Sequence, residues 1–157
     1  MSSSGKSKTT IEKLKKASVV VIRTDWNADI VDELFAGCKK ILEAGNVVWS
    51  DFLVPGAVEI PFAIKKYWEQ TGKKKPDAFI ALGCVIKGDT PHFEFVCRAV
   101  TDGISGLNLQ LPVPVIFGVL TVNSEDQAKQ RIGGIHGHKG EEAAEAAIKM
   151  ISFSRSL

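Results

Sequence analysis

The sequence predicts an α/β protein: a three-layer α/β/α sandwich with a four-stranded parallel sheet at its centre. Short runs rich in β-branched residues alternate along the chain with longer segments of helical periodicity. Strands that are joined through helices run parallel, and the right-handed crossovers between them place helices on both faces of the sheet. The length of 157 residues suits one such domain with a single core.

The first half of the chain contains two strand–helix units. Residues 18–24 (SVVVIRT) read as a buried strand, and residues 29–44 follow as an amphipathic helix. Residues 46–54 form the second strand and residues 57–70 the second helix, where Pro61 is tolerated because it lies near the first turn. The apolar residues of the first helix share one face: Ile30, Leu34, Cys38, Ile41 and Leu42.

The third strand and the helix after it give the clearest pattern. Residues 77–84 are the strand, Thr90 can cap the helix, and Pro91 suits its first position. One apolar stripe runs along that helix, formed by Phe93, Val96, Cys97, Val100, Ile104 and Leu107.

The last part of the chain completes the sheet. Residues 113–121 read as the fourth strand. Ser124 and Gln127 form a capping-box pattern that opens a short helix. A glycine-rich loop over residues 133–140 then leads into an Ala-rich final helix. We expect this domain to span residues 17–157.

Charge and composition exclude several classes of protein. Residues 1–16 are rich in Ser and Lys without the apolar segment of a signal peptide, so we expect a flexible arm. A net charge of +2 gives no strong attraction to nucleic acid, and no apolar run is long enough for a membrane span. The odd set of Cys38, Cys84 and Cys97, with no CxxC pair, fits reduced thiols in the cytoplasm.

Unusual residues concentrate in the four segments that follow the strands. In parallel sheets, ligands bind beyond the carboxyl ends of the strands. Those ends lead into residues 25–27, 55–59 and 85–92, and the fourth strand ends within 117–121. The sequence therefore predicts a ligand site at this edge of the sheet.

The segment Gly88-Asp89-Thr90-Pro91-His92 runs directly into a helix N-terminus, where free backbone N–H groups can bind an anion. A plain helix cap without a ligand is an equally open reading. Asp89 would repel a phosphate unless its carboxylate points away. His92, beside such an anion, can act as a proton shuttle, although an isolated His is more often structural.

Aromatic and polar residues in the other loops suit a heteroaromatic ligand. Trp26 and Phe117 offer flat faces, and the Asn27 amide can both donate and accept hydrogen bonds. Glu59 could bind ligand hydroxyls. The alternative is that both rings belong to the core and that Glu59 is an early helix acid favoured by the helix dipole.

Basic residues near the end of the chain could pair with phosphate. Arg131 and Lys139 are the candidates, with surface solvation as the usual alternative for such residues. His136 and His138 form an H-x-H pattern, but no further ligands stand at a recognisable metal-site spacing. We therefore do not expect a metal site in this segment.

Taken in order, these motifs resemble the 6,7-dimethyl-8-ribityllumazine synthase family. The segments that carry the resemblance are Trp26-Asn27, PGAVEIP at 55–61, VIKGDTPHFEFV at 85–96, FGVLT at 117–121, residues 127–131, and KGEEAA at 139–144. The resemblance covers nearly the whole chain after the N-terminal arm. It implies a flavodoxin-like fold and an enzyme of the penultimate step of riboflavin biosynthesis. The implied reaction condenses 5-amino-6-(D-ribitylamino)uracil with 3,4-dihydroxy-2-butanone 4-phosphate.

The resemblance also implies a role for each site residue. Trp26 would stack on the pyrimidine, Glu59 would bind ribityl hydroxyls, and His92 would transfer protons. Backbone N–H groups of Asp89 and Thr90 would bind the phosphate. The remaining residues of the aminouracil site would be Asn27, Ala57, Val58, Cys84, Val85 and Ile86, completed from the neighbouring subunit by Phe117 and Lys139, while that subunit's Arg131 grips phosphate.

Three positions depart from the family pattern. Trp26 stands where the family often has Phe, a change that should preserve stacking. Val58 stands where an aromatic residue is common, which should weaken contact on one side of the ring. His138 replaces a usual Asn and could alter the pH response of the loop.

The family resemblance implies a homopentamer, and some members assemble pentamers into a sixty-subunit icosahedral shell. The short loop between Arg131 and Lys139 favours the shell. Association with riboflavin synthase is a further expectation. Two rival functions stay open: a riboflavin synthase of the archaeal type, and a non-catalytic paralogue that binds flavin or lumazine or forms a shell.

Overall fold

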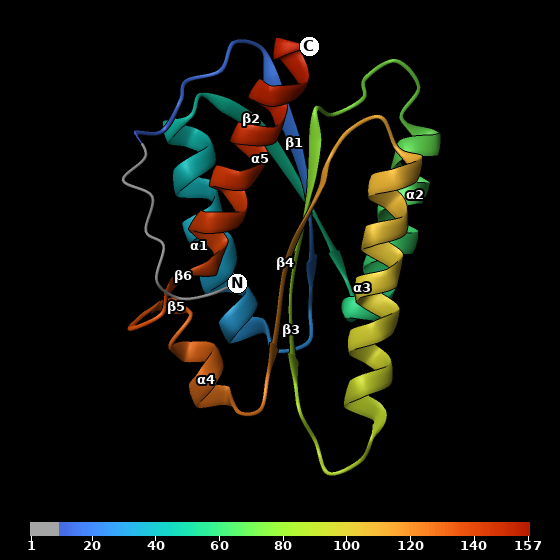
Figure 1. Cartoon of the computed structure of the whole chain (residues 1–157), viewed down its shortest axis with the longest axis vertical. Coiled ribbons are helices and arrows are strands. Elements are labelled where there is room, and N and C mark those ends of the chain that lie inside the picture. Colours follow the sequence, from blue (N-terminus) through green and yellow to red (C-terminus); the bar gives the residue numbers. More distant parts are fainter. Residues whose placement is uncertain (1–9) are drawn as a thin grey trace.

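The computed structural model describes residues 10–157 and forms a three-layer α/β/α sandwich (Figure 1). Its central sheet has four strands in the order β2-β1-β3-β4, all parallel, which confirms the predicted fold class. The strands are β1 (Ala17–Thr24), β2 (Val47–Val54), β3 (Ala78–Ile86) and β4 (Val115–Val122). This order corresponds to the first four positions of the 2-1-3-4-5 strand order of doubly wound, flavodoxin-like sheets.

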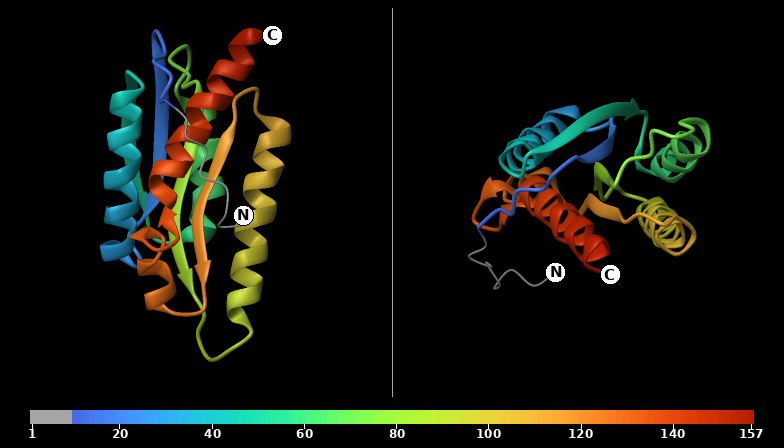
Figure 2. Two further views of the ribbon diagram at one scale, coloured as in Figure 1. Left: turned by 60° about the vertical axis from the view of Figure 1, so that its left-hand side comes forward. Right: turned by 90° about the horizontal axis from the view of Figure 1, so that it is seen from above.

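Helices cover both faces of the sheet (Figure 2). One face carries α1 (Ala28–Ala44) and α5 (Lys139–Ser156). The other carries α2 (Ile60–Gln70), which a short 3₁₀ turn η1 (Ala57–Glu59) precedes, and α3 (His92–Gln110). In residues 10–157, no helix is long and apolar enough to cross a membrane.

Strand β1 lies at the centre of two apolar cores. Val19 and Val21 pack with the buried residues of α1 and α5, while Val20 and Ile22 pack with those of α2 and α3. Because both faces of β1 are buried, its sequence is a continuous apolar run rather than an alternating one. The run of apolar residues in SVVVIRT is therefore explained by the position of β1 between β2 and β3, with helices on both faces.

The predicted apolar stripes behave differently in the two long helices. All five stripe residues of α1 are buried, as expected. In α3, only Val100, Ile104 and Leu107 belong to the buried core. Phe93 and Val96 lie in the first turns of α3 and line a cavity, and the partly buried Val96 also packs against the core.

The structure shifts several element boundaries. Strand β3 continues to Ile86 rather than ending at Cys84, and Pro91 is the N-cap of α3 rather than its first helical residue. The predicted glycine-rich loop contains a hairpin of β5 (Ile132–Gly134) and β6 (Gly137–His138). Gly133 and Gly137 have φ values of 106° and 80°, a conformation that favours glycine and that the period-2 strand pattern could not reveal.

Residues 1–9 of the expected arm lie outside the described residues. The following segment, residues 10–16, packs on the domain. Leu14 is buried, and its N–H donates to the Gly45 carbonyl at 2.9 Å. The Arg155 guanidinium donates to the Lys15 carbonyl at 2.7 Å. These contacts attach the chain before β1 to the end of α1 and to α5.

Candidate active site

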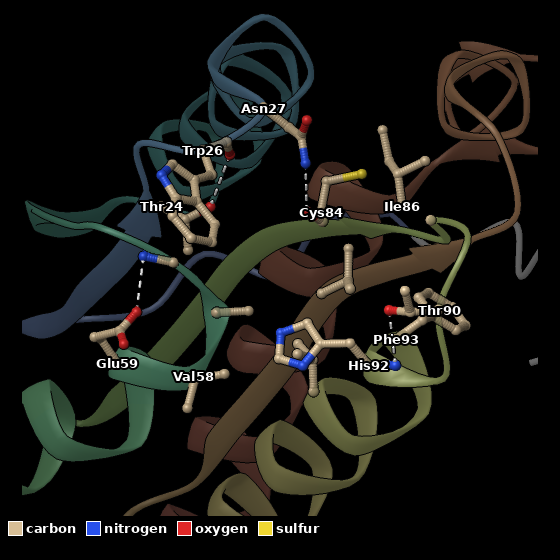
Figure 3. A pocket seen from close by; sticks show the side chains of 15 residues that line it. Thr24, Trp26, Asn27, Val58, Glu59, Cys84, Ile86, Thr90, His92 and Phe93 are labelled. Carbon is tan, nitrogen blue, oxygen red and sulfur yellow. Dashed lines mark hydrogen bonds between the residues drawn. The ribbon is translucent and has the colours of Figure 1, made fainter.

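A cavity of about 490 Å³ opens at the carboxyl ends of the central strands, where the sequence predicts a ligand site (Figure 3). Its walls come from three connections, β1–α1, β2–α2 and β3–α3, together with the first turns of α3. It is lined by Thr24, Trp26, Asn27, Gly56, Ala57, Val58, Glu59, Cys84, Val85, Ile86, Gly88, Thr90, His92, Phe93 and Val96.

Hydrogen bonds fix the β1–α1 connection in place. The buried Thr24 hydroxyl donates to the Trp26 carbonyl at 3.3 Å. Asn27 has left-handed backbone angles, φ 58° and ψ 43°, which Asn tolerates better than most residues. Its side-chain amide donates to the Cys84 carbonyl at 2.8 Å and thereby ties this connection to β3. Trp26 itself is 72% exposed, so its ring is not part of the core.

The β2–α2 connection places a carboxylate and an apolar side chain at the cavity. Glu59 ends the 3₁₀ turn η1, and its Oε2 accepts the N–H of Gly56 at 3.0 Å. This bond holds one oxygen of the carboxylate at the Gly56 backbone, which lies between Glu59 and the Trp26 ring in Figure 3. Val58 is 47% exposed and points into the same space.

The β3–α3 connection forms the opposite wall. Thr90 Oγ1 accepts the backbone N–H of His92 at 3.4 Å. The His92 imidazole points into the cavity towards Val58 (Figure 3). Asp89 is exposed and does not line the cavity. This wall therefore combines the backbone of a helix N-terminus with an imidazole side chain that faces the cavity.

The floor of the cavity is uncharged. Burial and, to a lesser extent, the negative charge of Glu125 together raise the pKa of the Cys84 thiol to about 11. The thiol therefore stays protonated at neutral pH and presents a neutral, polarisable surface. Val85 and Ile86 continue this floor as apolar side chains.

Three predicted site residues lie away from this cavity within the chain. Phe117 projects from the edge strand β4 and is 42% exposed. The Arg131 guanidinium donates to the Gln127 carbonyl at 3.0 Å, and Lys139 pairs with Glu142 at 2.8 Å. The structure thus brings ten of the predicted residues together, and it places Asp89, Phe117, Arg131 and Lys139 outside the group.

His138 has a structural contact. Its Nδ1 accepts the backbone N–H of Glu141 at 3.3 Å and caps α5. Across residues 10–157, no group of three or more His, Cys, Asp or Glu side chains is arranged to hold a metal ion.

Five lining residues are not among the predicted site residues: Thr24, Gly56, Gly88, Phe93 and Val96. Phe93 and Val96 were assigned to the core stripe, because the pattern does not show that the first turns of α3 extend past the sheet. Thr24 is the last residue of β1, and because β1 is buried on both faces its sequence does not alternate between apolar and polar residues. The pattern therefore does not show which side chain at its end faces a cavity. Gly56 stands inside the PGAVEIP motif, and its closeness to the ligand-facing residues was the available signal.

The fold and cavity define a class of protein, an α/β protein with a ligand-sized cavity beyond the carboxyl ends of a parallel sheet. A family model described as 6,7-dimethyl-8-ribityllumazine synthase matches residues 16–155. Because that match covers most of the chain, the chain belongs to the 6,7-dimethyl-8-ribityllumazine synthase family.

Individual relatives agree with the family model. The 6,7-dimethyl-8-ribityllumazine synthase of Parabacteroides distasonis is 43% identical over 140 residues, which cover 87% of this chain and 86% of that protein. The enzyme of Bacteroides fragilis is also 43% identical, over 87% of this chain and 96% of its own length. The enzyme of Bdellovibrio bacteriovorus is 44% identical, over 90% of this chain and 78% of its own length.

Replacement of Asn27 should separate its two structural contributions. Asn27→Ala and Asn27→Gly both lose the hydrogen bond to Cys84, worth about 1 kcal/mol. Only Ala is strained by left-handed backbone angles, at a cost of roughly 1–2 kcal/mol. We expect the free energy of unfolding to be about 1 kcal/mol lower for Asn27→Ala than for Asn27→Gly, measured by urea denaturation at one protein concentration. Equal stabilities would show that the left-handed conformation is not required.

Proposed function

We propose that this protein is a 6,7-dimethyl-8-ribityllumazine synthase that condenses 5-amino-6-(D-ribitylamino)uracil with 3,4-dihydroxy-2-butanone 4-phosphate, releasing phosphate and water. The main support for this proposal is that a chain of this family has a cavity whose two walls suit the two substrates. One wall offers an exposed indole and a carboxylate, and the facing wall offers a helix N-terminus and His92. The first wall suits an aromatic polyol, and the second suits a phosphate ester.

In this proposal the aminouracil lies against Trp26. The indole is exposed on the cavity side, and stacking on a flat ring uses such a surface. Glu59 carries acceptor oxygens beside that ring for the ribityl hydroxyls. The remaining contacts of the pyrimidine come from the amide, backbone and apolar groups of Asn27, Ala57, Val58, Cys84, Val85 and Ile86.

The butanone phosphate binds at the start of α3. The phosphate accepts hydrogen bonds from the backbone N–H groups of Asp89 and Thr90. These groups lie at the N-terminal end of α3, where the helix dipole favours negative charge. The exposed position of Asp89 allows its carboxylate to face solvent rather than the phosphate. The Arg131 guanidinium of a neighbouring subunit supplies the countercharge.

Proximity supplies most of the catalysis in this mechanism. The 5-amino group attacks the butanone carbonyl and loses water to form an imine, and elimination of phosphate then leaves an enol. The enol tautomerises to a ketone, and the ribitylamino nitrogen attacks this ketone and closes the ring with loss of a second water. Holding two reactants in orientation can contribute roughly 7–11 kcal/mol. His92 moves protons during these steps, a share on the order of 10²–10⁴-fold. Neither a metal nor a redox cofactor takes part.

The active unit in this proposal is a homo-oligomer, a pentamer that can assemble further into a sixty-subunit shell. Phe117, Arg131 and Lys139 lie outside the cavity of their own chain, as expected of residues that complete the cavity of a neighbouring subunit. Large apolar side chains on α2 and α3 are exposed in the single chain, including Phe62 at 72% and Phe95 at 66%. Such surfaces are typical of subunit interfaces. Association with riboflavin synthase, which would consume the product, is part of the same proposal.

We also place the enzyme in the cytoplasm. Cys38 and Cys84 are buried and unpaired, and burial raises the pKa of the Cys38 thiol to about 12. Unpaired thiols of this kind are typical of a reducing compartment.

The proposed activity is tested by a turnover assay with both substrates, following lumazine absorbance and phosphate release together. We expect the two products in equal amounts and at a rate well above the uncatalysed reaction. Tight binding of lumazine or riboflavin without turnover would support the non-catalytic paralogue instead. Formation of riboflavin from lumazine alone would support the archaeal-type riboflavin synthase.

His92→Ala should be slow but not inactive, because the orientation of the two reactants survives the loss of the imidazole. We expect kcat to fall by roughly 10- to 10³-fold, within the range of general acid–base catalysis, with smaller changes in either KM. His92→Gln, which keeps a polar side chain of similar length, is the matched control for lost packing. Unchanged kcat in His92→Ala would contradict a role in proton transfer.

Sharing of the site between subunits predicts complementation. His92→Ala and Arg131→Ala each damage every site of their own assembly. Equal amounts of the two variants that are unfolded and refolded together should recover about a quarter of wild-type activity. In a random mixture, half of the sites have a native His92 and half of those have a native Arg131 from the neighbouring subunit. If one chain supplied both residues, mixing would restore nothing. Each variant refolded by itself is the control.

A further inference from the structure

Gly56 lies on the cavity wall between the two groups that the proposed function uses on the aminouracil. Its N–H donates to Glu59 Oε2 at 3.0 Å, drawn as a dashed line in Figure 3. Its backbone angles, φ −143° and ψ 176°, are extended and open to any residue. Glycine is therefore not required here by the backbone conformation, and the question becomes one of space.

The space for a side chain at position 56 is tight, because Glu59 and Trp26 lie close to it. A Cβ there would lie 3.1 Å from Glu59 Oε2 and 3.3 Å from Trp26 Cε3. Both distances are shorter than ordinary van der Waals contact, so each neighbour would have to move by a few tenths of an ångström. Trp26 and Glu59 are both exposed, and they can move without disturbing the core. An added methyl group would therefore displace these two side chains rather than unfold the domain.

The backbone on either side is fixed, so the displacement cannot be absorbed there. The N–H of Trp26 donates to the Pro55 carbonyl at 3.1 Å, and the N–H of Asp25 donates to the Val54 carbonyl at 2.8 Å. These bonds continue the β1–β2 pairing beyond the strands and hold the base of the indole beside Gly56. The bare backbone of Gly56 thus supports one edge of the ring and one oxygen of the carboxylate together.

We propose that Gly56 is a positioning residue for the aminouracil. It fixes the position of the Trp26 ring, which stacks on the aminouracil, relative to the Glu59 carboxylate, which binds its hydroxyl groups. This inference rests on the proposed function and assigns to Gly56 a role that acts through those two side chains. The phosphate half of the site, at the start of α3, does not touch Gly56. A change at position 56 should accordingly affect one substrate and spare the other.

The test is Gly56→Ala, compared with wild type in steady-state kinetics and in calorimetric titration with 5-amino-6-(D-ribitylamino)uracil. We expect the KM and the Kd for the aminouracil to rise roughly tenfold, because displacement of both contacts weakens its binding. The KM for the butanone phosphate should change by less than about twofold. Gly106→Ala, a methyl group added in α3 where the only neighbour within 4 Å is Gln110 at 3.9 Å, is the matched control.

A double-mutant cycle separates positioning from a general structural effect. Trp26→Phe removes the part of the indole that a methyl group at position 56 would displace. The Kd penalty of Gly56→Ala should therefore be several-fold smaller in the Trp26→Phe background than in wild type. Equal penalties in both backgrounds, or an equal rise in both KM values, would overturn the proposal.

The remaining outcomes also decide the question. Failure of both Gly56→Ala and Gly56→Ala/Trp26→Phe to fold, judged by circular dichroism, would overturn it by showing that Gly56 serves the core. Wild-type protein that binds the aminouracil without turnover would refute the proposed function, while the calorimetric comparison would still test Gly56. Wild-type turnover with an unchanged Gly56→Ala would refute the inference alone.

Discussion

The parallel pairing of β1 with both β2 and β3 is the constraint on which the rest of the structure depends. Each strand enters the sheet in the same direction, so the connections that leave β1, β2 and β3 emerge at one edge. Residues as distant in sequence as Trp26, Glu59 and His92 thereby line one cavity. Burial of β1 on both faces fixes the register of this pairing, because a shift by one residue would exchange the side chains of the two cores.

The sheet brings the connections together, but a few hydrogen bonds determine how they meet. Asn27 reaches across to the Cys84 carbonyl, and Trp26 pairs with Pro55 through the backbone. These bonds use groups that the strands leave unpaired at their ends. The bases of these loops are therefore held by hydrogen bonds, while Trp26 and Glu59 stay exposed at the cavity. A rigid backbone under exposed functional groups is the arrangement that preorganised binding requires.

The sequence revealed most of the fold because local patterns and tertiary structure agree in this chain. The α1 stripe and the Ser124 cap could both be predicted, since each depends on residues close in sequence. What could not be predicted depends on where elements end in space. The stripe of α3 is continuous in sequence, but the sheet covers only its later turns, so Phe93 and Val96 line the cavity. The β5–β6 hairpin depends on glycine angles that no apolar periodicity encodes.

The two departures from the family pattern at the cavity are best considered together. Trp26 is larger than the Phe that the family often has, and Val58 is smaller than the common aromatic residue. Both side chains are exposed at the cavity, so neither substitution leaves a void in the core. The indole rests on Gly56 and extends from the β1–α1 connection, while Val58 lies in the neighbouring β2–α2 connection. Between them these two connections thus carry one aromatic ring rather than two, and in the proposed binding mode the position of that ring beside Gly56 determines more of the contact with the aminouracil.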